Sequence, residues 1–216
     1  MNKKVIIIGS GGHAKVIIDI IQGMKKYEII GVASSDKIKR IISGVPILGN
    51  DSILIDLYKS GVKHAFIAIG DCKLRDIIFN YVNKIGFDLV NAISPSANIS
   101  PTVKIGFGVA IMPGVSINVD SIIEDNVIIN TNASIDHDNV IKKSVHIAPG
   151  CNLAGNVTVG EGTFLGIGCK VIPKIFIGKW STIGAGSVVI KDVPSNTVVF
   201  GVPAKVIKNN NSKSHE

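Results

Sequence analysis

The most regular feature of the chain is an aliphatic residue at every sixth position between residues 93 and 189. An α-helix needs apolar positions about 3.6 residues apart and a half-buried strand needs them two apart, so this period excludes both as long elements. A fixed short repeat is instead typical of a solenoid. Seventeen hexads begin in this way without insertion or deletion, at Ile93, Ile99, Ile105, Ile111, Ile117, Ile123, Ile129, Ile135, Ile141, Ile147, Leu153, Val159, Leu165, Val171, Ile177, Ile183 and Val189.

The period predicts a parallel β-helix whose coils have three short faces of six residues each. Every face is a short strand stacked about 4.8 Å from the equivalent strand of the next coil, with its aliphatic residue pointing inward. The residue four places later is mostly small, as a corner requires, with Asn139 and Ile175 as exceptions. We also expect the glycines that directly follow the aliphatic residue to supply unusual backbone angles at the corners. These glycines are Gly106, Gly160, Gly166, Gly178 and Gly184.

The first ninety residues carry a different pattern, in which short apolar runs alternate with amphipathic segments. This pattern predicts strands over residues 5–8, 29–32, 65–69 and 88–92, and helices over 14–24, 53–59 and 74–84. Alternating strands and helices are typical of an α/β domain with a parallel sheet. We therefore expect a small Rossmann-like α/β domain over 1–92, an all-β parallel β-helix of hexapeptide repeats over 93–207, and a polar, disordered tail over 208–216.

A glycine-rich turn follows the first predicted strand and reads G-S-G-G-H-A-K over residues 9–15. It satisfies the pattern G-x-G-x-x-A between a strand and a helix, so backbone N–H groups at the helix start can hold a phosphate. A complete dinucleotide site is disfavoured for two reasons. No acidic residue ends the second strand, where the chain reads A-S-S-D over 33–36, and the domain is only half of a two-nucleotide fold.

Two histidines lie within the repeats, and one of them is suited to act as a general base. His137 is flanked by Asp136 and Asp138, and a carboxylate bonded to one ring nitrogen raises the basicity of the other. The alternative for His137 is a solvated polar corner. His146 is nine residues away, or one and a half hexads, so we expect it on a different face, where a structural hydrogen bond is its alternative role. No third histidine in the repeats completes a metal site, and we expect no metal.

The composition of the chain indicates which classes of ligand it is suited to bind. Lys and Arg outnumber Asp and Glu by 23 to 16, a net charge of +7 that suits phosphorylated small molecules. Nucleic acid is disfavoured, because the lysines are scattered without interleaved aromatic residues. The three cysteines lie far apart, which indicates reduced thiols and a cytoplasmic location. No apolar run approaches the roughly eighteen residues of a membrane span.

Several motifs together resemble one group of bacterial enzymes. They are G-S-G-G-H-A-K over 9–15, F-I-A-I-G over 66–70, S-P-S-A over 94–97, the hexads, and G-V-P-A-K over 201–205. Over nearly its whole length the chain resembles the hexapeptide-repeat sugar acetyltransferases. The resemblance is closest to those that act on UDP-linked 4-amino-4,6-dideoxy-N-acetyl sugars in bacillosamine and perosamine pathways, and extends to sialic acid O-acetyltransferases. It implies a left-handed β-helix, an exception to the usual right-handed crossover.

The resemblance also implies a nucleotide-sugar site in the first domain. Gly11, Gly12 and His13 would contact the nucleotide sugar, and Gly70 would lie near it. Ser34 stands in the segment where the family usually has two adjacent acidic residues near the uridine. This departure leaves open whether the nucleotide is uridine.

For the repeats, the resemblance implies the reacting groups and the path of acetyl-CoA. His137 would be the base and Asp138 the orienting acid, with Asp136 a less suitable partner. His146 would lie near the acetyl group or the pantetheine arm. The other residues that the resemblance places along CoA are Ile167, Gly168, Ala185 and Lys205.

These observations favour an acetyl-CoA-dependent N-acetyltransferase that acetylates the 4-amino group of a UDP-linked 4-amino-4,6-dideoxy-N-acetyl sugar for glycan biosynthesis. Because a single prism has no deep cleft, we expect a homotrimer with sites between subunits, where His137 of one chain faces CoA held partly by the next. One alternative is an O-acetyltransferase on sialic acid or a polysaccharide precursor. An alternative of another class is a non-catalytic solenoid that binds nucleotide sugars.

Overall fold

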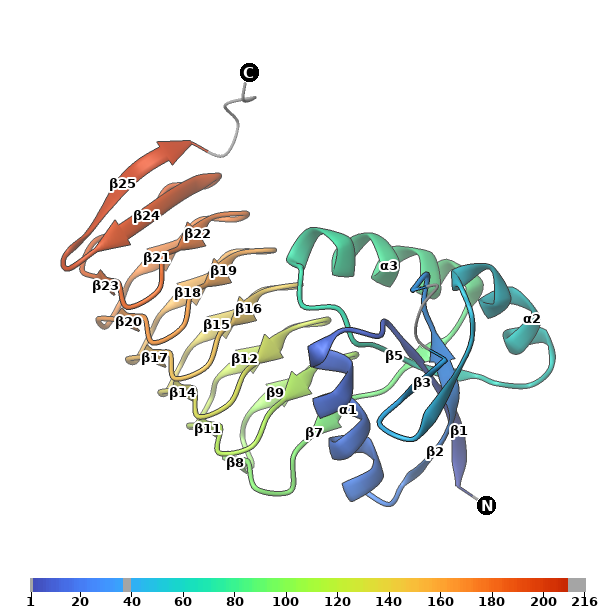
Figure 1. Cartoon of the computed structure of the whole chain (residues 1–216). Helices are drawn as coiled ribbons and strands as arrows, with labels where there is room; N and C mark the ends of the chain where they lie inside the picture. The colour runs from blue at the N-terminus through green and yellow to red at the C-terminus, as the bar shows by residue number, and fades with distance from the viewer. Residues whose placement is uncertain (1, 37–39, 210–216) are drawn as a thin grey trace, which may run out of the picture. The chain divides into compact units, whose positions relative to one another are not determined.

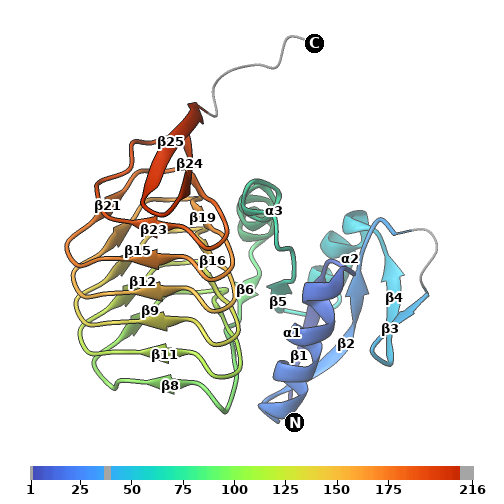
Figure 2. The same cartoon turned by 60° about the vertical axis from the view of Figure 1, so that its left-hand side comes forward.

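The computed structural model describes residues 2–36 and 40–209. The chain divides into two compact units, Met1–Pro95 and Ser96–Glu216, with the division three residues beyond the expected boundary at 92/93. Figures 1 and 2 show the helices of the first unit and the stacked coils of the second.

The first unit is a six-stranded sheet with helices. Its strand order is β3-β4-β2-β1-β5-β6, and every neighbouring pair is parallel except β3 with β4. Its elements in chain order are β1 (Lys3–Ile8), α1 (Gly12–Gly23), β2 (Tyr27–Ala33), β3 (Ile41–Ile42), β4 (Val45–Gly49), η1 (Asp51–Ile53), α2 (Leu54–Lys59), β5 (His64–Ile67), α3 (Cys72–Ile85), β6 (Asp88–Leu89) and β7 (Ala92–Ile93).

The strands and helices that the sequence predicts for this unit are present, with shifted ends. The strand expected over 88–92 forms the two short strands β6 and β7 instead. The hairpin of β3 and β4 was not predicted from the sequence, because each strand is short and no alternating pattern marks it. Ser43 and Gly44 both have positive φ, at 46° and 78°, as a two-residue hairpin turn requires.

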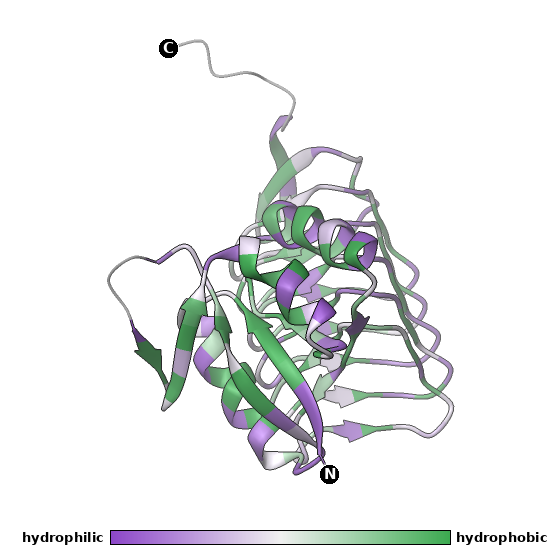
Figure 3. Ribbon diagram, turned by 90° about the vertical axis from the view of Figure 1, so that its right-hand side faces the viewer, coloured by the Kyte–Doolittle hydropathy of each residue, from purple (hydrophilic) through white to green (hydrophobic). Residues whose placement is uncertain are grey.

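The central position of β1 explains its uninterrupted apolar sequence. Val5 to Ile8 have no exposed surface, because β1 pairs with β2 on one side and β5 on the other. Figure 3 shows the change along β1 from its hydrophilic start to this hydrophobic stretch. Of these residues, Ile6 and Ile8 share a core with Phe79 and Val82 of helix α3.

The second unit is a parallel β-helix whose coils are eighteen residues long. Ile129 pairs with Ile147, Ile135 with Leu153, and Ile141 with Val159, each in parallel register. The strands are β8 (Asn98–Ile99), β9 (Lys104–Ile105), β10 (Ala110–Ile111), β11 (Ser116–Ile117), β12 (Ile122–Ile123), β13 (Ile128–Ile129), β14 (Ser134–Ile135), β15 (Val140–Ile141), β16 (His146–Ile147), β17 (Asn152–Leu153), β18 (Thr158–Val159), β19 (Phe164–Leu165), β20 (Lys170–Val171), β21 (Phe176–Ile177), β22 (Thr182–Ile183), β23 (Val188–Val189), β24 (Thr197–Gly201) and β25 (Ala204–Asn209).

Three faces run along this β-helix, as the period predicts. The first contains β7, β10, β13, β16, β19, β22, β24 and β25, the second β8, β11, β14, β17, β20 and β23, and the third β9, β12, β15, β18 and β21. The aliphatic residues from Ile111 onward are almost fully buried. Ile99 and Ile105 are only partly buried, because β8 and β9 end their sheets.

The glycines that directly follow the aliphatic residues were expected to supply unusual backbone angles at the corners, and this expectation is wrong. The backbone adopts positive φ three places after the aliphatic residue, in every hexad from Gly108 to Gly186. The glycines directly after the aliphatic residue are not among the residues with positive φ. They are needed because the next coil is close: a Cβ on Gly166 would lie 2.6 Å from the backbone nitrogen of Ala185. Close stacking therefore selects glycine there.

The β-helix ends in a hairpin, in which β24 pairs in parallel with β22 and antiparallel with β25. Lys208 and Asn209, the first residues of the expected disordered tail, belong to β25, so that part of the prediction is wrong. The remainder of the tail, 210–216, lies outside the described residues. Within residues 2–36 and 40–209, no helix has the length and apolar character needed to cross a membrane.

Candidate active site

The candidate base lies at a corner of the β-helix that follows β14. Asp138 occupies the position of positive φ, at 57°, and this turn brings its carboxylate beside the ring of the preceding residue. His137 Nδ1 and Asp138 Oδ2 are 2.7 Å apart. The side chain of His137 is 48% exposed, so a substrate can reach it.

The contact determines which ring nitrogen can take a proton. With Nδ1–H donating to the Asp138 carboxylate, Nε2 carries the lone pair. The hydrogen bond to Asp138 raises the pKa of His137 above its ordinary value. The geometry therefore has the form of a base oriented by an acid.

The other flanking acid has a different role. Asp136 Oδ1 accepts a hydrogen bond from Asn118 Nδ2 at 2.8 Å and one from the backbone nitrogen of His137 at 2.9 Å. These two hydrogen bonds, that from Asn118 first, lower the pKa of Asp136. Asp136 thus holds the backbone of the corner, while Asp138 contacts the ring.

Two further residues support His137, and neither role was predicted from the sequence. Gly155 stacks one coil away, where a Cβ would lie 2.5 Å from both Cε1 and Nε2 of the ring. Asn139 is fully buried and donates to the carbonyl oxygens of Asp136, His137 and Ala154, at 2.7, 3.3 and 3.0 Å. The eighteen-residue coil could have identified Gly155, since it places residues 137 and 155 in register.

His146 lies on another face, as the spacing predicts, because β16 and β14 belong to different sheets. Its side chain is buried, with Nε2 3.3 Å from Asn130 Nδ2 and its ring edge-on to Phe164 at 5.2 Å between centroids. The structure therefore does not bring His146 together with His137 within one chain.

The residues expected along CoA share the face of His146. Ile167 and Ala185 follow β19 and β22 at equivalent positions one coil apart, and both are exposed. Gly168 follows Ile167 with a φ of 69°, and its N–H donates to Pro149 O at 2.9 Å. Lys205 is exposed on the hairpin strand β25. These residues form an open strip, with the expected base on a different face.

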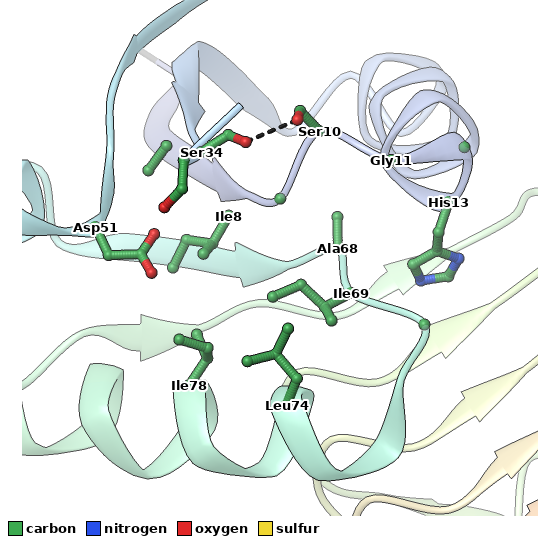
Figure 4. A pocket seen from close by; sticks show the side chains of 15 residues that line it. Ile8, Ser10, Gly11, His13, Ser34, Asp51, Ala68, Ile69, Leu74 and Ile78 are labelled. Atoms are coloured by element: carbon green, nitrogen blue, oxygen red, sulfur yellow. Dashed lines mark hydrogen bonds between the residues drawn. The ribbon is translucent and has the colours of Figure 1, made fainter. Parts of the chain in front are cut away.

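In the first unit, the predicted nucleotide-sugar residues meet in one cavity of about 540 Å³. It lies where the carboxyl ends of β1, β2 and β5 meet, the usual place for a ligand in such a sheet. Gly11, Gly12, His13, Ser34 and Gly70 all line it. Figure 4 shows its labelled side chains and the hydrogen bond of 2.7 Å between the hydroxyl oxygens of Ser10 and Ser34.

The backbone around this cavity is positioned by close contacts. Gly9 has a φ of 109°, and a Cβ there would lie 2.8 Å from the carbonyl oxygen of Ala68. Helix α1 begins at Gly12 without a side-chain cap, so its first N–H groups face a ligand position. The buried guanidinium of Arg75 donates to Ile69 O at 3.1 Å and Gly70 O at 2.9 Å.

Two features of the cavity could not be read from the sequence. Arg75 braces the loop after β5, although nothing in the helical pattern of α3 marks it as buried. Asp51, at the start of η1, lines the cavity, and burial raises the pKa of its carboxyl. In the part of the chain that the structure describes, no cluster of three or more His, Cys, Asp or Glu could hold a metal ion.

The chain is similar to a known family model and to several solved acetyltransferases. Residues 4–82 match the model of the PglD N-terminal domain. The perosamine N-acetyltransferase of Caulobacter crescentus, solved with CoA and GDP-perosamine, is 44% identical with a TM-score of 0.92, covering 95% of this chain and 97% of that one. The acetyltransferase domain of PglB from Neisseria gonorrhoeae, solved with acetyl coenzyme A, is 33% identical with a TM-score of 0.91, covering 96% and 100%.

A curated relative is Uncharacterized protein L142 of Acanthamoeba polyphaga mimivirus, 34% identical over 121 residues. That match spans 56% of this chain but only 24% of the relative's length. Together with the solved structures, the architecture confirms the predicted fold class: an α/β Rossmann-like domain and a left-handed parallel β-helix.

Proposed function

Because this chain belongs to the hexapeptide-repeat sugar acetyltransferases, which use acetyl-CoA, we propose that it acetylates the amine of a nucleoside-diphosphate-linked 4-amino-4,6-dideoxy sugar. The observation that carries the proposal is the ring of His137, oriented by Asp138 with Nε2 available to accept a proton. The cavity at the glycine-rich turn supports the nucleotide-sugar part of the proposal. The 44% identical perosamine enzyme, solved with GDP-perosamine, supports the class of acceptor.

The reaction needs one base and no metal. Nε2 of His137 accepts a proton from the sugar amine as its nitrogen attacks the thioester carbonyl carbon. The new C–N bond forms, the C–S bond breaks, and the imidazolium returns its proton to the sulfur of CoA. Between these two steps the Asp138 carboxylate stabilises the imidazolium, because it accepts a hydrogen bond from Nδ1–H of His137 in both protonation states.

A complete site requires a second copy of the chain. His137 lies at the corner after β14, whereas His146, Ile167 and Ala185 follow the face of β16, β19 and β22. A base and a CoA strip on different faces of one prism meet only across an interface. We therefore propose a homotrimer in which His137 of one chain faces CoA bound along the strip of its neighbour.

Two alternatives to the proposed activity are O-acetylation and a non-catalytic binding role. O-acetylation of sialic acid or a polysaccharide precursor would use the same base, because a hydroxyl is deprotonated by the same Nε2. A non-catalytic solenoid would have no need for the orienting contact of 2.7 Å to Asp138. We also propose a cytoplasmic location, since none of Cys72, Cys151 and Cys169 forms a disulfide.

The test measures free-thiol release from acetyl-CoA with UDP- and GDP-linked 4-amino sugars and with sialic acid as acceptors. We expect turnover with an amino sugar and a loss of about 10²- to 10⁴-fold in kcat for His137→Ala. His64→Asn is the control, because His64 lies on β5, outside the proposed site. Unchanged turnover in His137→Ala, or turnover with sialic acid alone, would overturn the proposal.

A further inference from the structure

One carboxylate in the cavity of the first unit has no partner among the residues that the structure describes. Asp51 lines the cavity, and among the described residues no hydrogen bond or ion pair reaches its side chain. A partly buried carboxylate without a donor costs free energy that a polar ligand can recover. The neighbouring polar residue, Asn50, is already engaged, since its Oδ1 accepts from the backbone nitrogen and the hydroxyl of Ser52 at 3.0 and 2.6 Å.

The sheet places Asp51 at a definite distance from the phosphate position. Asp51 follows β4, and the strand order β4-β2-β1 puts it two strand spacings, or about 10 Å, from the turn that begins α1. Ser34 ends β2, between the two. A nucleoside diphosphate whose phosphates bind at Gly11 and Gly12 would therefore place its ribose near Ser34 and its base near Asp51.

The cavity also supplies a surface for the flat side of a base. Ile69 and Leu74 lie between the Asp51 carboxylate and the His13 ring in Figure 4, and Ile78 lies near the Asp51 end. Apolar side chains along a planar ring leave its polar edge to be recognised by the carboxylate.

Guanine is the base whose edge fits a carboxylate. Its N1–H and its exocyclic amino group are adjacent parallel donors, so both oxygens of one carboxylate can accept from it. Uracil and thymine have a single N–H between two carbonyl oxygens, and a carboxylate there would face a repelling oxygen. Cytosine and adenine place an acceptor nitrogen beside their amino group, which leaves the second oxygen unpaired.

We propose that Asp51 selects guanine, and that the substrate of this chain is a GDP-linked amino sugar. The inference rests on the proposed function for the sugar, but the nucleotide choice is a property of the cavity alone. It replaces the uridine implied by the resemblance in the sequence. The absence of the family's acidic pair at Ala33 and Ser34 fits this change, because the carboxylate of Asp51, in the helix η1 that follows β4, takes over the base contact.

The test measures the Kd of free GDP and free UDP by calorimetry, on the full chain, for the wild type and Asp51→Asn. We expect the wild type to bind GDP at least about 10-fold more tightly than UDP, the usual range for a bidentate base contact. Asp51→Asn should weaken GDP by about 10- to 100-fold and change UDP by less than about 3-fold. Asp56→Asn, an exposed carboxyl on α2 outside the cavity, should leave both values unchanged.

Any other result for the binding of GDP and UDP contradicts the inference. Equal or tighter binding of UDP by the wild type overturns it, as does a similar loss for both nucleotides in Asp51→Asn. Failure of the wider proposal is distinguished by thiol release: an enzyme that uses a UDP-linked amino sugar, with His137 essential, keeps its proposed function while this inference fails. Selective GDP binding without any acetyl transfer keeps the inference on the base and overturns the function.

Discussion

Replacing Asp138 by Asn tests the proposed role of the acid without disturbing the corner. Asp138 has a φ of 57°, a conformation that Asn tolerates better than Ala, so the turn should persist. The substitution removes the charge that accepts the Nδ1 proton at 2.7 Å. It thereby separates the effect of the carboxylate on His137 from the effect of backbone shape.

The magnitude follows from the exposure of the pair. In buried triads, loss of the acid lowers kcat by about 10⁴-fold. Here the side chains of His137 and Asp138 are 48% and 50% exposed, so water screens the charge and replaces part of the lost hydrogen bonding. We expect kcat/KM at its high-pH plateau to fall by about 10- to 100-fold.

The pH profile gives the sharper result. The base acts in its neutral form, so activity rises as pH increases through the pKa of His137. The contact with Asp138 raises that pKa above the ordinary value, and Asp138→Asn should therefore move the acid limb of kcat/KM to lower pH. Asp136→Asn is the matched control, because Asp136 contacts the backbone and not the ring, and should move the limb less. An acid limb that stays in place in Asp138→Asn would refute the reasoning.

Two further substitutions test packing in the β-helix. Gly155→Ala should displace the His137 ring, because the added Cβ would lie 2.5 Å from it. We expect kcat to fall by about 10-fold or more, while the circular dichroism spectrum and the melting temperature stay near those of the wild type. Full activity would contradict the placement of the ring. Ile129→Asp puts a carboxyl into a fully buried rung and should cost about 4 kcal/mol or more of unfolding free energy in urea titration. The control Ile172→Asp, at a side chain that is 40% exposed, should cost less than about 1 kcal/mol, and equal losses would show that the rung is not the cause.

The sequence predicted most of the fold because its signals are local. The six-residue period gives the length of each face of the β-helix. Three faces make one coil, and each coil stacks on the next in the same register. The β3–β4 hairpin was not predicted, because its strands are too short to show an alternating pattern. The corner residues were misjudged, since positive φ falls on Asn, Asp, Ser, Lys and Trp as well as Gly.

The sequence by itself determined the architecture and the pair of His137 and Asp138, because residues that are adjacent in the chain remain adjacent in the turn they form. Only the tertiary structure decided that Gly155 leaves room for the ring and that Asp51 shares a cavity with the glycine-rich turn. The physical reason is that these contacts depend on coil stacking and on strand order in the sheet. Both bring together residues from separate segments, and hydrophobic spacing carries no information about which polar groups then face each other.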